Sequence, residues 1–275
     1  MPTRLPKRSR SDHTPAPLPP DLLPGLVYRG RILLCLDYDG TLAEIASEPG
    51  AARPLPQVRE VLAALASRPH RVTVAIVTGR SIEALRALLT VPAGIALAGL
   101  HGMQIIATDG AYEFSAAAEQ CASELAQVRS WVAENVPQST GFVIEDKGAS
   151  LALHYRNARA SLADRLRREF ERFVGEQTSM LKVLHGKMVV EALPKIATKA
   201  HAVRSLRAHA AIDAVPVYFG DDLTDEDAFA ALGDEGISVL VGSTRASAAR
   251  YRVDNPAVVV RTLESIVAAA NNAPV

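Results

Sequence analysis

The sequence has few cysteines, no net charge and no long apolar run, and each of these absences excludes a class of protein. Its two cysteines, Cys35 and Cys121, cannot form a disulfide framework, so we expect a reducing, cytoplasmic location. Thirty basic residues balance thirty acidic ones, which leaves no overall field to hold nucleic acid or an anionic membrane. No apolar stretch approaches the ~20 residues that span a bilayer, and the start lacks the apolar segment of a signal peptide. Because the net charge is zero, we expect local charged groups to recognise any anionic substrate. Because no heptad pattern or long exposed strand demands a partner, we also expect a monomer.

The first 27 residues differ in composition from the rest of the chain. Prolines stand at positions 2, 6, 15, 17, 19, 20 and 24, and basic residues at positions 4, 7, 8 and 10. A segment of this composition has little apolar surface to bury. We therefore predict a disordered tail over residues 1–27.

Short apolar runs follow, and each ends in a glycine or a polar residue. They cover residues 32–36, 72–77, 95–98, 215–219 and 237–241. Continuous runs of this length are typical of strands that are buried on both faces of a parallel sheet. Helical patterns lie between several of them. Ser81 is the predicted N-cap of one helix, and Thr224 opens another, with Asp227 as its capping partner. This alternation predicts an open α/β sheet, which binds ligands beyond the carboxyl ends of its strands.

The middle of the chain has a different pattern. Between residues 109 and 193, polar and apolar residues alternate as they do in antiparallel strands, and hairpin turns are predicted at 147–148 and 185–186. The candidate strands are 142–146, 150–156 and 187–191, and the candidate helices lie around 125–131 and 162–174. We therefore predict an α+β cap over 109–193, inserted into a catalytic core of 28–108 and 194–275.

The clearest chemical signal is a pair of carboxylates at the end of the first apolar run. Asp37 and Asp39 stand two residues apart and precede a glycine turn. Phosphoryl transfer from a monoester needs a nucleophile, a proton for the leaving oxygen and a cation to balance the charge of the phosphate. Asp37 is the candidate nucleophile, and Asp39 is the candidate acid that then acts as a base. The alternative is a turn with two solvated aspartates.

Three other segments bring polar groups to the same edge of the predicted sheet. The run 220–225 supplies further carboxylates, and Mg²⁺ prefers such oxygen ligands. The predicted metal ligands are Asp37, Asp39, Asp221, Asp222 and Asp225, with Asp222 and Asp225 acting through water or as orienting groups. Thr78, Gly79 and Arg80 precede a helix whose free N–H groups suit an anion. Lys199 is placed to neutralise the phosphate. The alternative for residues 220–225 is ordinary negative charge at a helix start. The alternative for residues 78–80 is a capped turn, and that for Lys199 is a solvated surface lysine.

These four segments, in this order, resemble the haloacid dehalogenase-like phosphatase superfamily. Residues 37–41 (DYDGT) resemble its first motif, Thr78 its second, Lys199 its third, and 220–222 with Asp225 its fourth. The resemblance covers about residues 31–260 and implies a Rossmann-like core, Mg²⁺, an aspartyl-phosphate intermediate and a class II type of cap. The third motif departs from the family pattern because alanine, not glycine, follows the lysine. Lys195 therefore stays an alternative for the lysine that binds the phosphate.

Four further segments, residues 99–102, 145–148, 153–156 and 186–191, resemble trehalose-6-phosphate phosphatases. In that family the residues that match Glu145, Lys147, Arg156, Lys187 and Glu191 contact the disaccharide or its phosphate. Such charged groups can read the hydroxyls of a sugar. The alternative for these residues is a charged hairpin surface.

Three residues of the core complete the expected substrate site: Gly79, Arg80 and His101. His101 and His154 are equally compatible with structural, hydrogen-bonded roles. The resemblance implies the hydrolysis of trehalose 6-phosphate. The rivals are a phosphatase for sucrose phosphate or glucosylglycerol phosphate, a phosphoryl mutase, and a non-catalytic module that binds a sugar phosphate.

Overall fold

The chain folds as two compact units, and the computed structural model describes residues 14–46, 49–114, 116–186 and 188–274. The larger unit comprises Met1–Gly102, Ile106–Tyr112 and Thr198–Val275. The smaller unit comprises Met103–Ile105 and Glu113–Ala197. The sequence-based limits of the inserted cap are 109–193.

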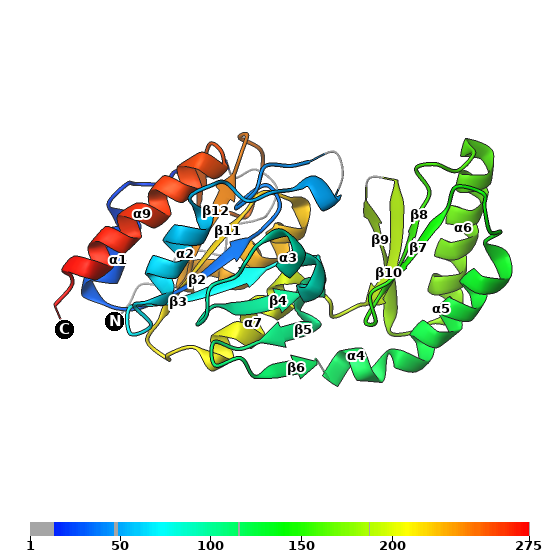
Figure 1. Ribbon diagram of the computed structural model, residues 1–275, viewed down its shortest axis with the longest axis horizontal. Helices are drawn as coiled ribbons and strands as arrows, with labels where there is room; N and C mark the ends of the chain where they lie inside the picture. The colour runs from blue at the N-terminus through cyan, green and yellow to red at the C-terminus, as the bar shows by residue number, and fades with distance from the viewer. Residues whose placement is uncertain (1–13, 47–48, 115, 187, 275) are drawn as a thin grey trace. The chain divides into compact units, whose positions relative to one another are not determined.

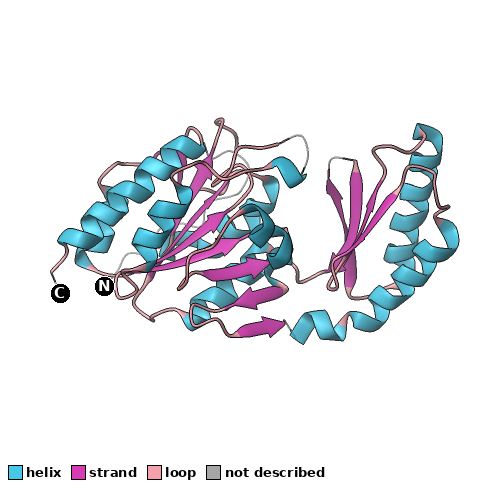
Figure 2. Cartoon of the chain, viewed as in Figure 1, coloured by secondary structure: helices cyan, strands magenta, loops and turns pink. Residues whose placement is uncertain are grey.

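A mainly parallel sheet forms the larger unit, which confirms the predicted α/β class (Figures 1 and 2). Its strands are β1 (Ala16–Pro17), β2 (Ile32–Asp37), β3 (Val72–Val77), β4 (Ala96–Gly99), β11 (Val215–Gly220), β12 (Ile237–Val241) and β13 (Tyr251–Val253). They lie in the order β1-β13-β12-β11-β2-β3-β4 and pair in parallel. Every residue of β2 is buried, as expected for a strand between two helical layers. The short strands β5 (Gln104–Ile106) and β6 (Tyr112–Phe114) follow β4 along the chain.

Helices lie on both faces of this sheet. On one face α1 (Leu22–Arg29) and α2 (Val58–Ala66) pack against α9 (Pro256–Asn272) (Figure 1). On the other face α7 (Lys199–His209) packs against α8 (Glu226–Leu232). α3 (Ile82–Leu88) follows β3. The side chain of Ser81 accepts a hydrogen bond from the Ala84 N–H at 3.1 Å, which confirms the predicted N-cap. The main core forms where side chains such as Leu34 and Leu36 meet the first helical layer.

The predicted disorder of residues 1–27 is wrong for the second half of that segment. There the chain forms β1, which pairs with β13, and then α1. Leu23 and Val27 lie one turn apart on α1 and are fully buried against the core. Pro24 stands in the first turn, where its missing N–H removes no helical hydrogen bond, so proline does not exclude a helix here. Residues 1–13 lie outside the described residues.

The smaller unit is an antiparallel sheet with two helices on one face. Its strands are β7 (Val143–Asp146), β8 (Leu151–His154), β9 (Leu181–Gly186) and β10 (Val189–Pro194), in the order β7-β8-β10-β9. A short α4 (Ala116–Gln120) precedes α5 (Ala122–Asn135), and α6 (Ala160–Gln177) follows β8. Side chains of Leu153, Phe170 and Val190 build the core between the sheet and α5 and α6. The antiparallel pairing agrees with the predicted α+β character, although the sequence pattern missed β9.

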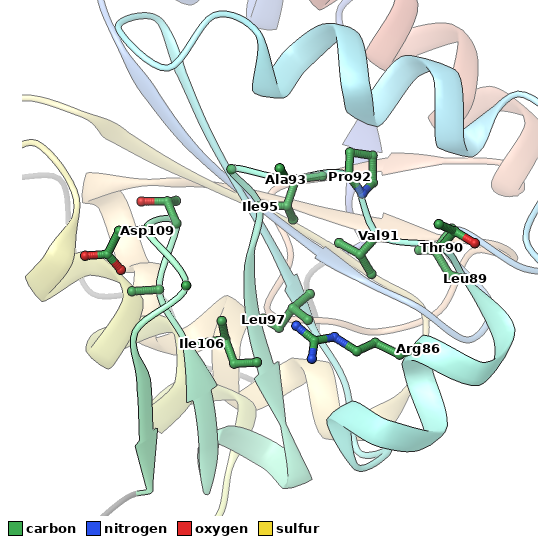
Figure 3. Close-up of a pocket in the computed structure, with 14 residues that line it drawn as sticks. Arg86, Leu89, Thr90, Val91, Pro92, Ala93, Ile95, Leu97, Ile106 and Asp109 are labelled. Carbon is green, nitrogen blue, oxygen red and sulfur yellow. The ribbon is translucent and has the colours of Figure 1, made fainter.

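A pocket of about 550 Å³ lies in the larger unit at the amino end of β4 (Figure 3). Aliphatic side chains, including Leu89, Ile95 and Ile106, line it, and Arg86 extends into it from α3. The pocket is at the end of the strand opposite to the predicted catalytic edge. Among the helices in the described ranges, none is both long and apolar enough to cross a membrane.

Candidate active site

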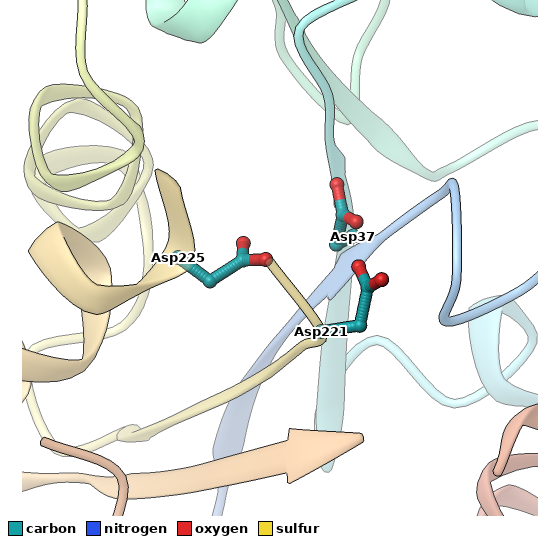
Figure 4. A group of neighbouring side chains, drawn as sticks. All are labelled: Asp37, Asp221 and Asp225. Atoms are coloured by element: carbon teal, nitrogen blue, oxygen red, sulfur yellow. The ribbon is translucent and has the colours of Figure 1, made fainter. Parts of the chain in front are cut away.

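The carboxyl ends of β2, β3 and β11 place three predicted site residues side by side. Asp37 is the last residue of β2, Thr78 follows β3, and Asp221 follows β11. β2 lies between β3 and β11 and pairs in parallel with both, so their carboxyl ends meet at one edge of the sheet. Figure 4 shows the carboxylates of Asp37, Asp221 and Asp225 directed toward a common space. One oxygen of each carboxylate lies within 4.8 Å of the other two.

Two glycines make this close approach possible. Gly40 has a φ of +73°, and a Cβ at this position would lie 2.1 Å from Asp221 Oδ2. A Cβ at Gly220 would lie 2.2 Å from Asp225 Cγ. Any side chain at either position would therefore displace a carboxylate. The packing of the acidic cluster therefore requires both Gly40, which the sequence pattern places in a turn, and Gly220, the last residue of β11.

Lys199 joins the carboxylates from the first position of α7. The side chain of Thr198 caps this helix by accepting a hydrogen bond from the His201 N–H at 3.1 Å. The Lys199 Nζ donates to Asp37 Oδ1 at 2.8 Å and to Asp225 Oδ1 at 2.7 Å, and its side chain is 4% exposed. Burial favours the neutral amine, but the carboxylates of Asp225 and Asp37 raise the pKa of Lys199 above its usual value. The side chain is therefore an ammonium.

Lys195, the alternative lysine, lies elsewhere. It belongs to the smaller unit, is exposed, and donates a hydrogen bond to the Ser179 carbonyl at 2.7 Å. The geometry therefore favours Lys199 as the lysine of the acidic cluster.

The charges of the cluster do not balance without a further cation. Burial raises the pKa of Asp37 well above its usual range, with a contribution from the Asp225 carboxylate that the nearby Lys199 ammonium opposes. Burial, together with Asp225, also raises the pKa of Asp221 to about 6. When ionised, three carboxylates and one ammonium leave two excess negative charges. A hard divalent cation with oxygen ligands fits this donor set, and it would be held by Asp37 and Asp221 with Asp225 beside them.

Asp225 receives hydrogen bonds on both carboxylate oxygens. Its Oδ1 accepts from Lys199 and from the Tyr218 hydroxyl, each at 2.7 Å, and its Oδ2 accepts from the Asp222 backbone N–H at 2.9 Å. The last bond belongs to a capping box at the start of the short 3₁₀ helix Leu223–Asp225. The prediction that Thr224 and Asp227 cap this region is therefore wrong. The observed capping box, Asp222 with Asp225, lies two residues earlier in the sequence, and the carboxylate of Asp225 also binds Lys199.

Asp222 and Asp39 lie outside the acidic cluster. Asp222 is exposed, and its carboxylate accepts a hydrogen bond from the neighbouring Leu223 N–H. Asp39 binds Arg80 with both oxygens, at 2.7 Å from Nε to Oδ2 and 2.6 Å from Nη2 to Oδ1. Burial disfavours the guanidinium charge, but the hydrogen bonds and charge of Asp39 raise the pKa of Arg80. The paired carboxylate is fixed near the end of β2, at the same edge of the sheet as Asp37.

The other predicted core residues line the same edge. Thr78 is buried, and its hydroxyl accepts a hydrogen bond from the Arg80 N–H at 3.1 Å. His101 is 8% exposed, has a left-handed backbone with φ of 55°, and its imidazole packs against Gly79. The backbone N–H of His101 donates a hydrogen bond to the Thr78 carbonyl at 3.1 Å. The loop after β4 is therefore tied to the turn after β3.

The smaller unit gathers a second set of predicted residues on its sheet. Glu145 in β7 and Glu191 in β10 both register with Ala152 of β8, so they lie in one row on one face. Lys147 Nζ lies 3.0 Å from Glu191 Oε2 and 4.0 Å from Glu145 Oε2. His154 Nε2 and Glu145 Oε2 are 2.9 Å apart. These side chains form a connected polar surface on the sheet and the turn that follows β7.

Two further predicted site residues of this unit are Arg156 and Lys187. Arg156 is exposed in the turn after β8. Lys187 lies outside the described residues.

Two residues that bind predicted site residues, Ser150 and Tyr218, are absent from the sequence-based prediction. Ser150 donates a hydrogen bond to Glu191 Oε1 at 2.5 Å, and Tyr218 donates to Asp225. Tyr218 is part of an apolar strand in the sequence pattern. Its hydroxyl is the signal that could have identified it, because a buried tyrosine oxygen usually has a polar partner.

The fold and the acidic edge of the sheet define an α/β protein with a candidate ligand site at the carboxyl ends of its parallel strands. A haloacid dehalogenase-like hydrolase from Bacteroides thetaiotaomicron shares this fold, with a TM-score of 0.60 over 86% of this chain and 99% of that chain, at 15% identity. Residues 35–257 match the model of the trehalose-phosphatase family. The chain belongs to the trehalose-phosphatase family.

Two curated relatives are similar to the chain in sequence. The chain is 32% identical over 262 residues to a trehalose-phosphate phosphatase of Mycobacterium tuberculosis, an alignment that covers 92% of this chain and 65% of the relative. It is 35% identical to a protein of the same species described as an uncharacterized glycosyl hydrolase, over 86% of this chain and 18% of the relative. The chain thus spans less than two thirds of these curated relatives.

A solved structure matches nearly end to end. The C-terminal domain of a Candida albicans trehalose-6-phosphate phosphatase aligns with a TM-score of 0.73 at 26% identity, over 94% of this chain and 99% of that one.

Proposed function

We propose that this protein hydrolyses trehalose 6-phosphate to trehalose and phosphate in a Mg²⁺-dependent reaction that passes through an aspartyl phosphate on Asp37. The observation that carries the proposal is the buried contact of Lys199 with Asp37, inside the cluster formed with Asp221 and Asp225. Membership of the trehalose-phosphatase family supports the substrate.

Asp37 is the nucleophile in this proposal. Lys199 binds its Oδ1 and so orients the carboxylate, and Oδ2 attacks phosphorus. The new bond joins Oδ2 to phosphorus, and the bond between phosphorus and the sugar oxygen breaks. Bound Mg²⁺ supplies positive charge against the phosphate and the carboxylates. The Lys199 ammonium adds to this charge as it builds on the phosphoryl oxygens.

Asp39 transfers the protons. Once released from Arg80 and protonated, it donates this proton to the departing sugar oxygen, and it then accepts one from the water that attacks the aspartyl phosphate. The bond between phosphorus and Asp37 Oδ2 breaks in this second step, which releases phosphate and restores the Asp37 carboxylate. The present ion pair of Asp39 with Arg80 occupies both carboxylate oxygens. Arg80 therefore has to exchange Asp39 for the substrate phosphate, for which its planar pair of N–H donors is well suited.

The charged surface of the smaller unit is the proposed reader of the disaccharide. Glu145, Lys147 and Glu191 offer acceptors and donors on one face of the sheet, and Ser150 orients Glu191. Arg156 and Lys187 complete this proposed set, in a cap of class II type. A site built to hydrogen-bond hydroxyls rejects sugars that lack them, because its own polar groups then lose partners.

We further propose a cytoplasmic monomer whose partner is this small substrate, with no nucleic acid or membrane partner. The zero net charge supports the second part of this proposal. The two free, buried cysteines are compatible with a reducing compartment.

The test is phosphate release from a panel of sugar phosphates, with Mg²⁺ and with EDTA. The panel contains trehalose 6-phosphate, sucrose 6-phosphate, glucosylglycerol phosphate and glucose 6-phosphate. We expect release from trehalose 6-phosphate alone, lost with EDTA. Release from another sugar phosphate instead would reject the substrate and keep the mechanism. Release that requires a second phosphorylated sugar would identify a mutase, and no release at all would favour a binding module.

A further inference from the structure

Tyr218 is a polar side chain in an otherwise apolar strand. It lies in β11, is fully buried, and donates a hydrogen bond from its hydroxyl to Asp225 Oδ1 at 2.7 Å. Phenylalanine would fill nearly the same volume without bringing a polar atom into the core. Burial of a hydroxyl is unfavourable unless a partner compensates it, so this tyrosine is explained by its bond to Asp225.

The oxygen that accepts from Tyr218 also accepts from Lys199. The Lys199 ammonium stands between Asp225 Oδ1 at 2.7 Å and Asp37 Oδ1 at 2.8 Å. The second oxygen of Asp225 accepts from the backbone of the adjacent turn. Both ends of the Asp225 carboxylate are therefore fixed, and the position of the ammonium depends on where this carboxylate lies.

The surroundings of Tyr218 leave little room for adjustment. Its ring packs edge-on against Phe229, with centroids 5.8 Å apart and planes at 79°. Gly220 supplies the space for Asp225, since any Cβ there would overlap the carboxylate. Among the described residues, Lys199 is the side-chain donor to Asp225 Oδ1 that remains without the hydroxyl. The carboxylate then loses one of the bonds that fix it, and the ammonium that it holds shifts relative to Asp37.

We propose that Tyr218 is a positioning residue for the phosphatase reaction: its hydroxyl fixes Asp225, which in turn holds the Lys199 ammonium at the nucleophile Asp37. The inference rests on the proposed function. Tyr218 acts through two other side chains, so its removal changes the turnover step rather than substrate binding.

The experiment compares kcat and KM of the wild type, Tyr218→Phe and Ser238→Ala, on p-nitrophenyl phosphate and on trehalose 6-phosphate. Ser238 is the matched control, because it registers with Tyr218 across β11 and β12 and is 2% exposed. Its hydroxyl accepts from the Arg250 N–H and is not bonded to Asp225. We expect Tyr218→Phe to lower kcat about tenfold on each compound that the wild type hydrolyses, with KM within about twofold. Ser238→Ala keeps the wild-type kcat.

Three results would overturn the inference: a wild-type kcat in Tyr218→Phe, an equal fall in Ser238→Ala, or a change confined to KM. If Tyr218→Phe does not fold, Asp225→Ala decides, because it removes the oxygen that accepts from both Tyr218 and Lys199. A wild-type kcat in folded Asp225→Ala also overturns it. A wild type that hydrolyses only the aryl phosphate rejects the proposed substrate while the Tyr218 comparison still stands. A wild type inactive on both compounds rejects the two proposals together.

Discussion

Arg80 binds both carboxylate oxygens of Asp39 in a planar, two-bond ion pair, with contacts of 2.7 and 2.6 Å. The pair joins the turn after β3 to the turn after β2, across 41 residues of sequence. It ties the proposed proton donor to the residue that is proposed to receive the substrate phosphate. The ion pair engages both carboxylate oxygens of Asp39 and two N–H donors of Arg80. Replacement of either residue should therefore change the rate of phosphate release.

Replacement of Arg80 by lysine tests this relationship. Lysine keeps the positive charge but cannot form two parallel hydrogen bonds. We expect kcat/KM to fall about 10- to 100-fold on every phosphate monoester that the wild type hydrolyses. Steady-state kinetics provide the measurement. Arg86→Lys is the control, because Arg86 is exposed on α3 and makes no ion pair within the described residues. Wild-type kinetics in Arg80→Lys would show that Asp39 and phosphate need only a positive charge.

The Asp37→Asn variant should lose turnover and keep its fold. Asparagine cannot attack phosphorus, and the change removes one negative charge from a cluster that has an excess. Because burial raises the pKa of Asp37, the ionised group is costly in the folded state, and the midpoint of thermal unfolding should stay equal or rise. Phosphate release and a melting curve give the two readouts. Asp213→Asn, at a surface carboxylate 63% exposed, controls for loss of charge alone. A variant that keeps most of its activity would reject Asp37 as the nucleophile.

The sequence predicts most of the core site because a simple rule applies there. Asp37 and Asp221 follow short apolar runs, and parallel strands bring such ends together. Local chemistry similarly predicts Ser81 as a helix cap. Contacts between distant residues are not encoded in this way. The pairing of Asp39 with Arg80 depends on how two turns meet, and the hydroxyl of Tyr218 is hidden within an apolar strand.

For residues 14–27 the sequence pattern predicted less order than the structure contains. Composition predicted disorder up to residue 27, yet Leu23 and Val27 have a buried face to pack against. Packing on α9 outweighs the low helical propensity of a segment that contains Pro24. Propensity describes the isolated segment, and the partner helix lies more than 200 residues away in the sequence.

Metal binding should stabilise the fold through Asp221. A ligand that binds only the folded state adds about 2.7 kcal/mol at 100 times its Kd, so Mg²⁺ should raise the unfolding temperature relative to EDTA. Asp221→Asn removes a carboxylate from the buried cluster and should abolish this shift. Asp222→Asn should keep it, because Asp222 is exposed and lies outside the cluster. Differential scanning fluorimetry on the three proteins is sufficient. A shift that survives in Asp221→Asn but not in Asp222→Asn would reverse the assignment of the two aspartates.

Glu191 should affect the sugar and leave the phosphoryl chemistry unchanged. Its carboxylate accepts from Lys147 and Ser150, so Glu191→Gln replaces a charged acceptor in a polar surface with a neutral amide. We expect kcat/KM for trehalose 6-phosphate to fall roughly 100-fold, while that for p-nitrophenyl phosphate stays within about twofold. Glu145→Gln should behave in the same way. Glu134→Gln is the control, because Glu134 is exposed on α5 in the helical layer of the same unit. Equal losses on the disaccharide and the aryl phosphate would remove the sugar-reading role, because an aryl phosphate offers no hydroxyls for these carboxylates to bind.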